Sequence, residues 1–331
     1  MQDTTYTLAR NTAALMDLSA EGRLRISGAE CEAALDSLFS VDLEMLAPYK
    51  GTIGLFLAAD GHTIAIAVVF KGEDEFFVFT EAETKQALSA YLNEQLQGRD
   101  VEIENLDETT GWIAVVGPKA QDVTAKAAGE DILGMPYHSF EDNTTIGGKL
   151  FRMGQVGEFE YRFLVPAAET ERVRAALLEA GAGFGIGEGD ASAIPMLMLE
   201  MRSLLHSDIP ASADPIQAGL HWMVDFRKPG LPAGEKLAAR KAQPERRALM
   251  VVAEDDGKMM AGDLLAIAGE EVGIVVRSAW SQTLGRSIAL SYVRDDLGWV
   301  GVPFDVLGAA GKVPVKGVSA PLFVTRTVQA S

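Results

Sequence analysis

The chain has 331 residues, of which 48% are hydrophobic and 23% are charged, a composition typical of a soluble globular protein of two or three domains. Its formal net charge of -18 disfavours a large basic surface for nucleic acid or for an anionic membrane. No apolar run reaches the roughly 18 residues that a membrane-spanning helix needs, and the first residues lack the basic and apolar regions of a signal peptide, so we expect a cytoplasmic protein.

Helix and strand patterns alternate through the first two thirds of the chain. Apolar spacing predicts a helix over residues 8–20, a strand over 24–27 and a helix over 30–39. Asp60 and Gly61 between the apolar runs of residues 51–70 predict a hairpin. The later predictions are a strand over 75–80, a helix over 84–97, a strand over 112–116, two strands within 150–165, a helix over 169–179, a helix over 196–205 and a strand over 220–226.

A boundary is predicted where the composition changes. Residues 228–245 are rich in Lys, Arg and Pro and predict a helix followed by a linker, so we divide the chain into a domain of residues 1–235 and a domain of residues 236–331. Strands dominate beyond it and fit a small β-barrel. The predicted strands cover residues 248–253, 271–276, 288–293, 313–318 and 322–325. The fold class is therefore α+β.

Several phrases occur in an order that resembles one known family. They are DLSAEGRLRISGAECEAAL from residue 17, VVGPKAQDVTAKAAGEDILGMPYHSF from residue 115 and TLGRSIALSYV from residue 283. Together they resemble the T protein of the glycine cleavage system, the aminomethyltransferase of a tetrahydrofolate-dependent family. The resemblance implies a three-lobed arrangement in which two lobes form a folate-binding, aminomethyltransferase-like domain and a C-terminal β-barrel closes one side. Tetrahydrofolate would sit in the central hole.

The family's acidic pair is missing from this chain. Members with aminomethyl activity carry two Asp residues after a Gly-Gly turn, and the matching phrase AADGHTIAIAVVF puts Ala65 and Ile66 at those positions. Neither side chain exchanges a proton, which argues against ordinary aminomethyl transfer. The nearest substitutes are Asp60 and His62, which are our candidate catalytic residues. The alternative interpretation is structural: Asp60 is a residue of the hairpin turn, and His62 faces solvent.

The family's pterin-binding phrase is only partly kept in MGQVGEFEYRF. Glu158 and Tyr161 match, whereas the Glu that would accept two hydrogen bonds from the pterin is replaced by Arg162. Either Glu158 or Glu160 replaces that acceptor, or the protein holds a different ligand, because an arginine that faces the cavity suits a carboxylate or a phosphate. Arg162 also fits a solvent-facing position on a strand.

The third phrase, AIPMLMLEMRSLL, keeps Glu200 but has Ile194 and Met198 where the family has folate-holding arginines. A methionine-rich helix fills a core or lines an apolar ligand pocket. Trp222 and Trp280 stand at bulky positions of the family and are either structural or stack on a flat heterocycle. The resemblance therefore implies six cofactor-binding residues: Glu158, Tyr161, Arg162, Glu200, Trp222 and Trp280.

Other motifs give little. The glycine-rich phrase GAGFGIGEGD follows a predicted helix, where a dinucleotide loop would follow a strand. Cys31 is the single cysteine, which excludes an internal disulfide and a cysteine-cluster metal site. The four histidines lack ligand spacing, so no metal is expected.

Two functions from different classes remain open. The first is a divergent tetrahydrofolate-dependent methyltransferase, similar to a demethylase, that acts on a small methylated compound; methyl transfer needs less proton management than aminomethyl transfer. The alternative is a catalytically degenerate subunit that binds folate or another ligand and serves a larger one-carbon or amine-oxidising complex. A genuine aminomethyltransferase with relocated groups is a third hypothesis.

Overall fold

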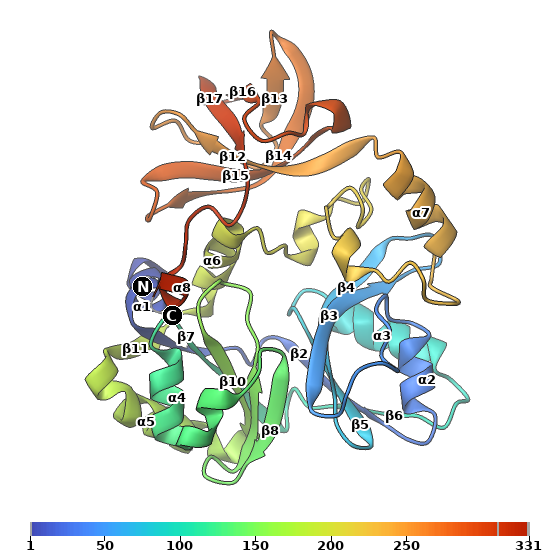
Figure 1. Cartoon of the computed structure of the whole chain (residues 1–331), viewed down its shortest axis with the longest axis vertical. Helices are drawn as coiled ribbons and strands as arrows, with labels where there is room; N and C mark the ends of the chain where they lie inside the picture. Colours follow the sequence, from blue (N-terminus) through green and yellow to red (C-terminus); the bar gives the residue numbers. More distant parts are fainter. Residues whose placement is uncertain (1, 310, 330–331) are drawn as a thin grey trace.

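The structure, a computed structural model, describes residues 2–309 and 311–329. Two α/β lobes and a β-barrel meet around a common centre, with the barrel on one side and the two lobes side by side on the other (Figure 1). The predicted α+β class, the three-lobed arrangement and the C-terminal barrel are confirmed. The helices are α1 (Gln2–Asn11), α2 (Cys31–Asp36), α3 (Lys85–Gln95), α4 (Ala120–Ala128), α5 (Thr170–Gly181), α6 (Ile194–Met201), α7 (Gly234–Ala242) and α8 (Arg326–Gln329).

One continuous sheet runs through both lobes in the order β11-β1-β7-β10-β9-β8-β3-β4-β5-β2-β6. The first lobe holds the strands from β11 to β8, and the second holds those from β3 to β6. A single registered pair, Lys50 with Ser139, joins the two halves. The strands are β1 (Ala13–Asp17), β2 (Gly22–Ser27), β3 (Lys50–Leu57), β4 (Thr63–Lys71), β5 (Glu75–Thr80), β6 (Glu102–Asn105), β7 (Thr110–Val116), β8 (Ser139–Asn143), β9 (Gly148–Arg152), β10 (Glu160–Pro166) and β11 (Ile186–Gly189).

The barrel closes because its first and last strands pair, in the order β12-β15-β14-β13-β16-β17. Closure leaves no free sheet edge. Its strands are β12 (Arg246–Ala253), β13 (Leu264–Ile267), β14 (Glu270–Ser281), β15 (Arg286–Arg294), β16 (Pro303–Gly308) and β17 (Gly311–Val318). The domain boundary that we predict after residue 235 falls within α7.

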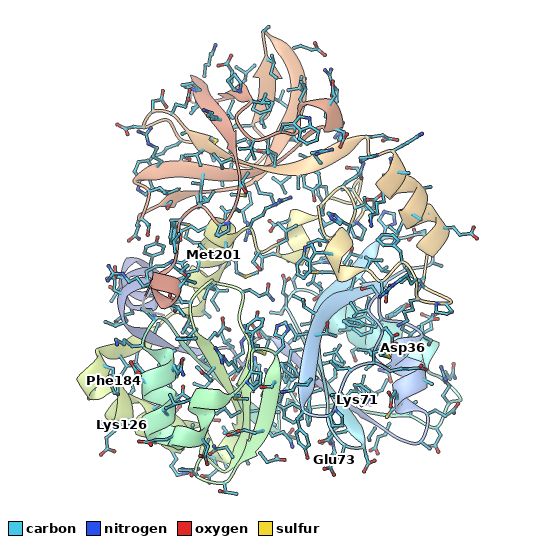
Figure 2. All side chains as sticks on the ribbon, viewed as in Figure 1. Asp36, Lys71, Glu73, Lys126, Phe184 and Met201 are labelled. Atoms are coloured by element: carbon cyan, nitrogen blue, oxygen red, sulfur yellow. The ribbon has the colours of Figure 1, made fainter. Side chains whose placement is uncertain are left out.

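An apolar layer fixes the barrel on the lobes. Leu57 of the second lobe, Leu199 of α6 and Leu290 of β15 belong to one buried cluster, distinct from the clusters inside each lobe and inside the barrel. The segment that crosses this junction is held by Lys228, which is buried and whose Nζ donates to the backbone and the carboxylate of Asp36. Figure 2 shows Asp36 in the second lobe and Met201 at the end of α6, where the first lobe approaches the barrel.

Three predicted elements are wrong, and strands β6, β8, β11, β13 and β16 are not among the predictions. Residues 8–20 are not one helix: α1 ends at Asn11, and Ala13–Asp17 forms β1, which is buried because strands flank it on both sides. A strand paired on both edges and buried on both faces has no polar alternation, so its apolar run also fits a helix. Residues 220–226 form a short 3-10 turn, η6 (His221–Met223), instead of a strand. Residues 186–189 form a strand, β11, and residues 322–325 form none.

Candidate functional site

A cavity lies at the centre, where both lobes and α6 meet. Strand β4 contributes Ile66, strand β10 contributes Glu160 and Arg162, and α6 contributes Ile194 and Met198. The cavity wall therefore includes Ile66, Arg162, Ile194 and Met198, four of the five positions at which the chain departs from the family phrases quoted above; the fifth, Ala65, is buried in the core of the second lobe. Its other lining residues are Glu21, Ala67, Val68, Phe79, Thr80, Glu81, Met153, Gln155, Val156 and Leu205.

Arg162 is held between two carboxylates. Alternate residues of a strand point to the same face, so Glu160 and Arg162 both face the cavity while Tyr161 faces the core. The Arg162 guanidinium donates from Nε to Glu160 Oε1 and from Nη1 to Glu21 Oε2, each at 2.6 Å, and it lies over the ring of Trp112. Burial raises the pKa of Glu160, and the two carboxylates raise the pKa of Arg162 against the effect of its own burial. The interpretation of Arg162 as a solvent-facing residue is wrong, because the side chain is buried.

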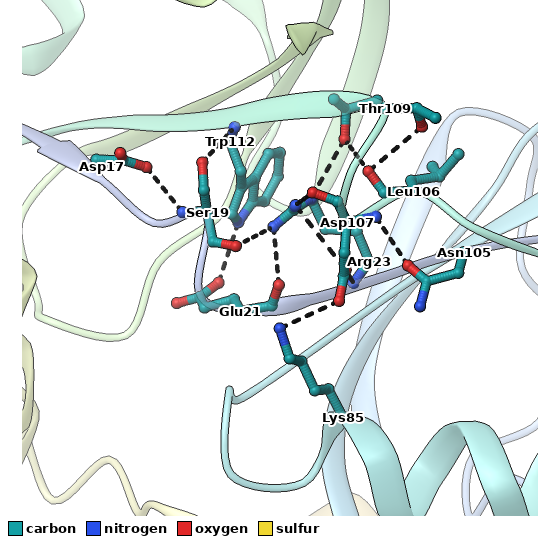
Figure 3. Close-up of polar contacts among 11 residues, drawn as sticks. Asp17, Ser19, Glu21, Arg23, Lys85, Asn105, Leu106, Asp107, Thr109 and Trp112 are labelled. Carbon is teal, nitrogen blue, oxygen red and sulfur yellow. Dashed lines mark hydrogen bonds and ion pairs between the residues drawn. The ribbon is translucent and has the colours of Figure 1, made fainter.

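The turn that presents Glu21 is itself braced by a buried arginine. Arg23 is fully buried and donates to the backbone carbonyls of Ser19, Glu21 and Asp107 (Figure 3). Trp112 Nε1 donates to Glu21 Oε2 at 3.0 Å, on the same oxygen that Arg162 contacts. The position of the Glu21 carboxylate is therefore set by two donors and a rigid backbone.

Glu81 carries the most distinctive chemistry of the cavity. It follows the last residue of β5, and its carboxylate accepts the backbone N–H of His206 at 2.9 and 3.2 Å. Burial raises the pKa of Glu81 to about 7, with further contributions from the nearby charges of Asp208 and Glu21. A carboxyl with a pKa near neutrality holds or releases a proton at physiological pH, which is the property of a general acid or base.

The barrel reaches the same region through Arg277 of β14 and through Tyr292 of β15, whose hydroxyl donates to the carbonyl of Asp208. Arg277 of β14 donates to the backbone carbonyls of Pro195 and Ser203 and forms an ion pair of 2.9 Å with Asp208. Burial lowers the pKa of Arg277 and raises the pKa of Asp208. Arg277 therefore links the barrel to both ends of the helix, α6, that forms one wall of the cavity.

Asp60 and His62 lie at the β3–β4 turn and do not line the cavity. Both side chains are more than half exposed, and Asp60 Oδ2 contacts His62 Nδ1 at 2.9 Å. His62 Nε2 also lies 3.0 Å from the carbonyl oxygen of Ala211, and Lys236 donates to the carbonyl of Asp60. These contacts correspond to the turn interpretation of the two residues.

Two predicted acidic ligands are engaged elsewhere. Glu158 accepts from the backbone N–H groups of Arg326 and Thr327 and from the Thr327 hydroxyl, so it fastens the start of α8. Glu200 is fully buried and accepts from Tyr6, Arg10 and Ser281, and it thereby joins α1, α6 and the barrel. We do not carry either residue into the proposed site.

The three aromatic candidates lie in different surroundings. Tyr161 is buried in the core of the first lobe, and its hydroxyl has no hydrogen-bond partner among the described residues. Trp280 is partly exposed on β14 and lines none of the cavities described here. Trp222 is 62% exposed and lines a second pocket, beside the central cavity.

Sequence reasoning missed Glu21 and Glu81 and left Glu160 as one alternative. The spacing of Glu160 and Arg162, two residues apart on a predicted strand, indicates that they share a face. No comparable signal marks Glu81, because its pKa is raised first by burial and then by the charges of Asp208 and Glu21, and all of these depend on segments distant in the sequence.

The described residues contain no helix long and apolar enough to cross a membrane. Within residues 2–309 and 311–329, no group of three His, Cys, Asp or Glu side chains is arranged to hold a metal ion.

This arrangement of two lobes and a closing barrel around a charged cavity is that of the folate-dependent aminomethyltransferase class. Residues 3–228 match the GCVT N-terminal domain, and residues 246–323 match the glycine cleavage T-protein C-terminal barrel domain. The chain belongs to the glycine cleavage T-protein family.

Relatives and a solved structure agree with this assignment. The chain is 28% identical to the aminomethyltransferase of Saccharopolyspora erythraea over 325 residues, which cover 96% of this chain and 89% of the relative. It is also 28% identical to that of Geobacillus kaustophilus over 308 residues, which cover 90% and 84%. The crystal structure of the glycine cleavage system aminomethyltransferase T from Bartonella henselae superposes with a TM-score of 0.89 at 20% identity, covering 98% of this chain and 90% of that one, which shows the shared fold.

Proposed function

We propose that this protein is a divergent tetrahydrofolate-dependent methyltransferase that takes a methyl group from a small methylated compound, in the manner of a demethylase. The observation that carries the proposal is the combination of Glu81, whose pKa is raised to about 7, with apolar residues at the family's acidic and arginine positions. Ile66, Ile194 and Met198 form an apolar wall that suits a methyl group better than it suits a cationic aminomethyl group. A cytoplasmic location is part of the same proposal.

The cavity offers carboxylates to a pterin even though the family's acceptor is absent. Glu21 faces the cavity beside Arg162 and can accept hydrogen bonds from an amidine edge, while Glu81 faces the cavity just after β5. Bound tetrahydrofolate would supply a nucleophilic nitrogen, which loses its proton on methylation; the bond between the methyl group and the donor's N, O or S atom would break, and the demethylated compound would leave with that electron pair. Glu81 is suited to accept that proton, because its pKa is matched to neutral pH.

The alternative, an accessory subunit that binds folate or another ligand for a partner protein, is favoured by a different observation. Arg162 stands at the pterin-acceptor position and is neutralised by Glu160 and Glu21, an arrangement that is complete without a ligand. A protein that had lost catalysis while keeping its fold would also keep such an internal ion pair.

Binding and turnover separate the two functions. Calorimetric titration with tetrahydrofolate tests binding, and isotopically methyl-labelled donors of the N-, O- and S-methyl classes test transfer, with methyltetrahydrofolate detected by mass spectrometry. We expect binding and transfer from one class. No heat and no thermal shift at millimolar tetrahydrofolate would refute the methyltransferase, and binding without transfer from any class would favour the accessory subunit.

A variant pair tests the role of Glu81. Glu81→Gln removes the titrating group while keeping its shape, and we expect kcat/KM for methyl transfer to fall about 100-fold, the order expected for loss of a general acid or base. The matched control is Glu94→Gln, because Glu94 is exposed and its charge is not among those that raise the pKa of Glu81. Equal activity in the two variants would remove Glu81 from the proposed site.

A further inference from the structure

A second pocket opens beside the central cavity, and Gln155 lines both. Its walls come from the loop before β8, from the end of α6 and from the turn around η6. None of its lining residues is acidic, although the chain has 47 Asp and Glu residues. The cation in its wall is Arg202. An acid-free pocket in so acidic a protein favours an anionic ligand.

Arg202 differs from the buried arginines around the centre in two respects: it is exposed at the pocket wall, and it forms no ion pair with a carboxylate among the described residues. Arg10, Arg162 and Arg277 each form an ion pair with a buried carboxylate. Among the described residues, the hydrogen bond recorded for Arg202 runs from Nη2 to the carbonyl of Ala248 at 3.2 Å. Partial burial lowers the pKa of Arg202, and the guanidinium still remains charged because an arginine pKa is so high. A guanidinium at a pocket wall with spare donors can bind a carboxylate through two parallel hydrogen bonds.

The backbone of the pocket is strained where two of its side chains begin. Arg202 has φ +56° and His138 has φ +53°, a left-handed conformation that glycine adopts at much lower cost. At Arg202 this conformation ends helix α6, because Arg202 is its C-cap and the following N–H, of Ser203, donates to the carbonyl of Met198. Opposite them, Gly219 leaves the room that Arg202 uses, since a Cβ there would lie 2.7 Å from Arg202 Nη2. The two strained positions thus place one cation and one imidazole on the same pocket.

Flat side chains form the rest of the recognition surface. The rings of Tyr137 and His138 stack with centroids 4.1 Å apart, and Trp222 is exposed in the wall of the same pocket. Burial lowers the pKa of His138 to about 4 and also lowers the pKa of His221. Both imidazoles are therefore neutral at pH 7, and the positive charge of the pocket is that of Arg202 alone among its described lining residues.

We propose that this pocket recognises the single carboxylate of a small substrate, with the guanidinium of Arg202 holding the carboxylate and the rings of Trp222 and Tyr137 covering the body of the molecule. The proposal deepens the function proposed above and rests on it for the identity of the ligand: the methyl donor would be a methylated monocarboxylic acid. One cation balances one carboxylate, whereas a dicarboxylate such as a glutamyl tail would leave a second negative charge uncompensated in an acidic protein.

A pair of matched probes tests the charge requirement without folate and without turnover. Benzoate and benzamide share a flat body and differ in the carboxylate, and quenching of tryptophan fluorescence reports their binding. We expect benzoate to bind at least tenfold more tightly than benzamide, with a quench that disappears in Trp222→Phe. Comparable binding of the two probes, or no binding of benzoate at tens of millimolar, would overturn the proposal.

Variants of Arg202 test whether benzoate binding depends on this arginine. Arg202→Gln and Arg202→Gly should each weaken benzoate binding at least tenfold, while Arg227→Gln, which alters an arginine whose side chain is 91% exposed, should leave it within twofold. Arg202→Gly is the safeguard for folding, because glycine suits φ +56°. Unchanged benzoate binding in a folded Arg202→Gly would overturn the proposal.

A dicarboxylate probe tests whether the pocket binds a monocarboxylic acid or a glutamyl tail. We expect p-aminobenzoylglutamate to bind no more tightly than benzoate; a tenfold tighter binding that depends on Arg202 would assign the pocket to a glutamyl tail and overturn the monocarboxylate. Because these measurements need no methyl transfer, failure of this proposal leaves the reaction untested, and absence of the reaction leaves these binding results unaffected.

Discussion

Replacing Glu81 with Gln should make the stability difference between variant and wild type depend on pH. The pKa of Glu81 is raised from 4.5 to about 7, mainly by burial. Below pH 4.5 the carboxyl is protonated in both the folded and the unfolded chain, so its ionisation does not change the free energy of unfolding. As the pH rises from 4.5 to 7, the unfolded chain releases the proton first, so ionisation increasingly favours unfolding. Above pH 7 the penalty is constant.

The size of the effect follows from the same pKa values. One pKa unit corresponds to about 1.36 kcal/mol, so the ionised carboxylate costs the folded state about 3 kcal/mol at pH 8. Glutamine cannot ionise, and its carbonyl can still accept the backbone N–H of His206. The free energy of unfolding of Glu81→Gln, relative to that of the wild type, should therefore rise by about 3 kcal/mol between pH 4 and pH 8.

Guanidinium denaturation at half-unit pH steps measures this gain. Comparing variant with wild type removes most of the background from the protein's large negative charge, and Glu94→Gln, at an exposed position whose charge is not among those that raise the pKa of Glu81, serves as the control. A Glu81→Gln difference that stays constant to within about 1 kcal/mol from pH 4 to pH 8 would show that burial does not raise this pKa.

Three further substitutions test the internal contacts. Arg162→Met leaves Glu160 and Glu21 without their shared cation and should lower the free energy of unfolding at pH 7 by about 3–5 kcal/mol; chemical denaturation measures it, and a loss below about 1 kcal/mol would contradict the ion pair. Lys228→Met removes a buried ammonium that donates to Asp36, Phe39 and Val41 and should cost about 2–4 kcal/mol by the same assay, whereas unchanged stability would mean that the junction is held by its apolar contacts alone. Glu158→Gln should weaken the cap on α8 by about 1 kcal/mol and speed hydrogen exchange at the amides of Arg326 and Thr327, and equal exchange rates would refute that role.

The barrel and most lobe elements were predictable because local patterns survive in them. Strands β12 and β15 are long and apolar, and the hairpin of β3 and β4 turns at Asp60 and Gly61 as its sequence indicates. The short strand β13 has four residues, too few for a period to be distinguished from a loop. The apolar run LFVT after Pro321 fits a strand, yet it leads instead into α8.

The lining residues of the central cavity were predictable only where they lie in a strand or helix phrase that resembles the family. The family phrases mark Ile66, Arg162, Ile194 and Met198, and all four line the cavity. What surrounds them depends on pairs distant in sequence: Arg162 with Glu21, and Arg202 with the turn at Gly219. Ion pairs and pocket walls of this kind leave no mark on local spacing, so sequence reasoning placed Glu158 and Glu200 in the site although both are used in structural contacts.

The register of the second lobe explains how a carboxyl can return to this cavity after the family's acidic pair is lost. Successive residues of β4 face opposite sides, so Ile66 faces the cavity while Ala65 is buried in the core of the lobe. Of the two lost acidic positions, Ile66 is therefore the one from which a side chain reaches the centre. The neighbouring strand β5 pairs Thr80 with Ala67, and the Thr80 hydroxyl donates to the carbonyl of Ile66. Glu81 comes next in the chain, so its carboxyl enters the cavity one strand away from the position that became apolar, and burial there raises its pKa.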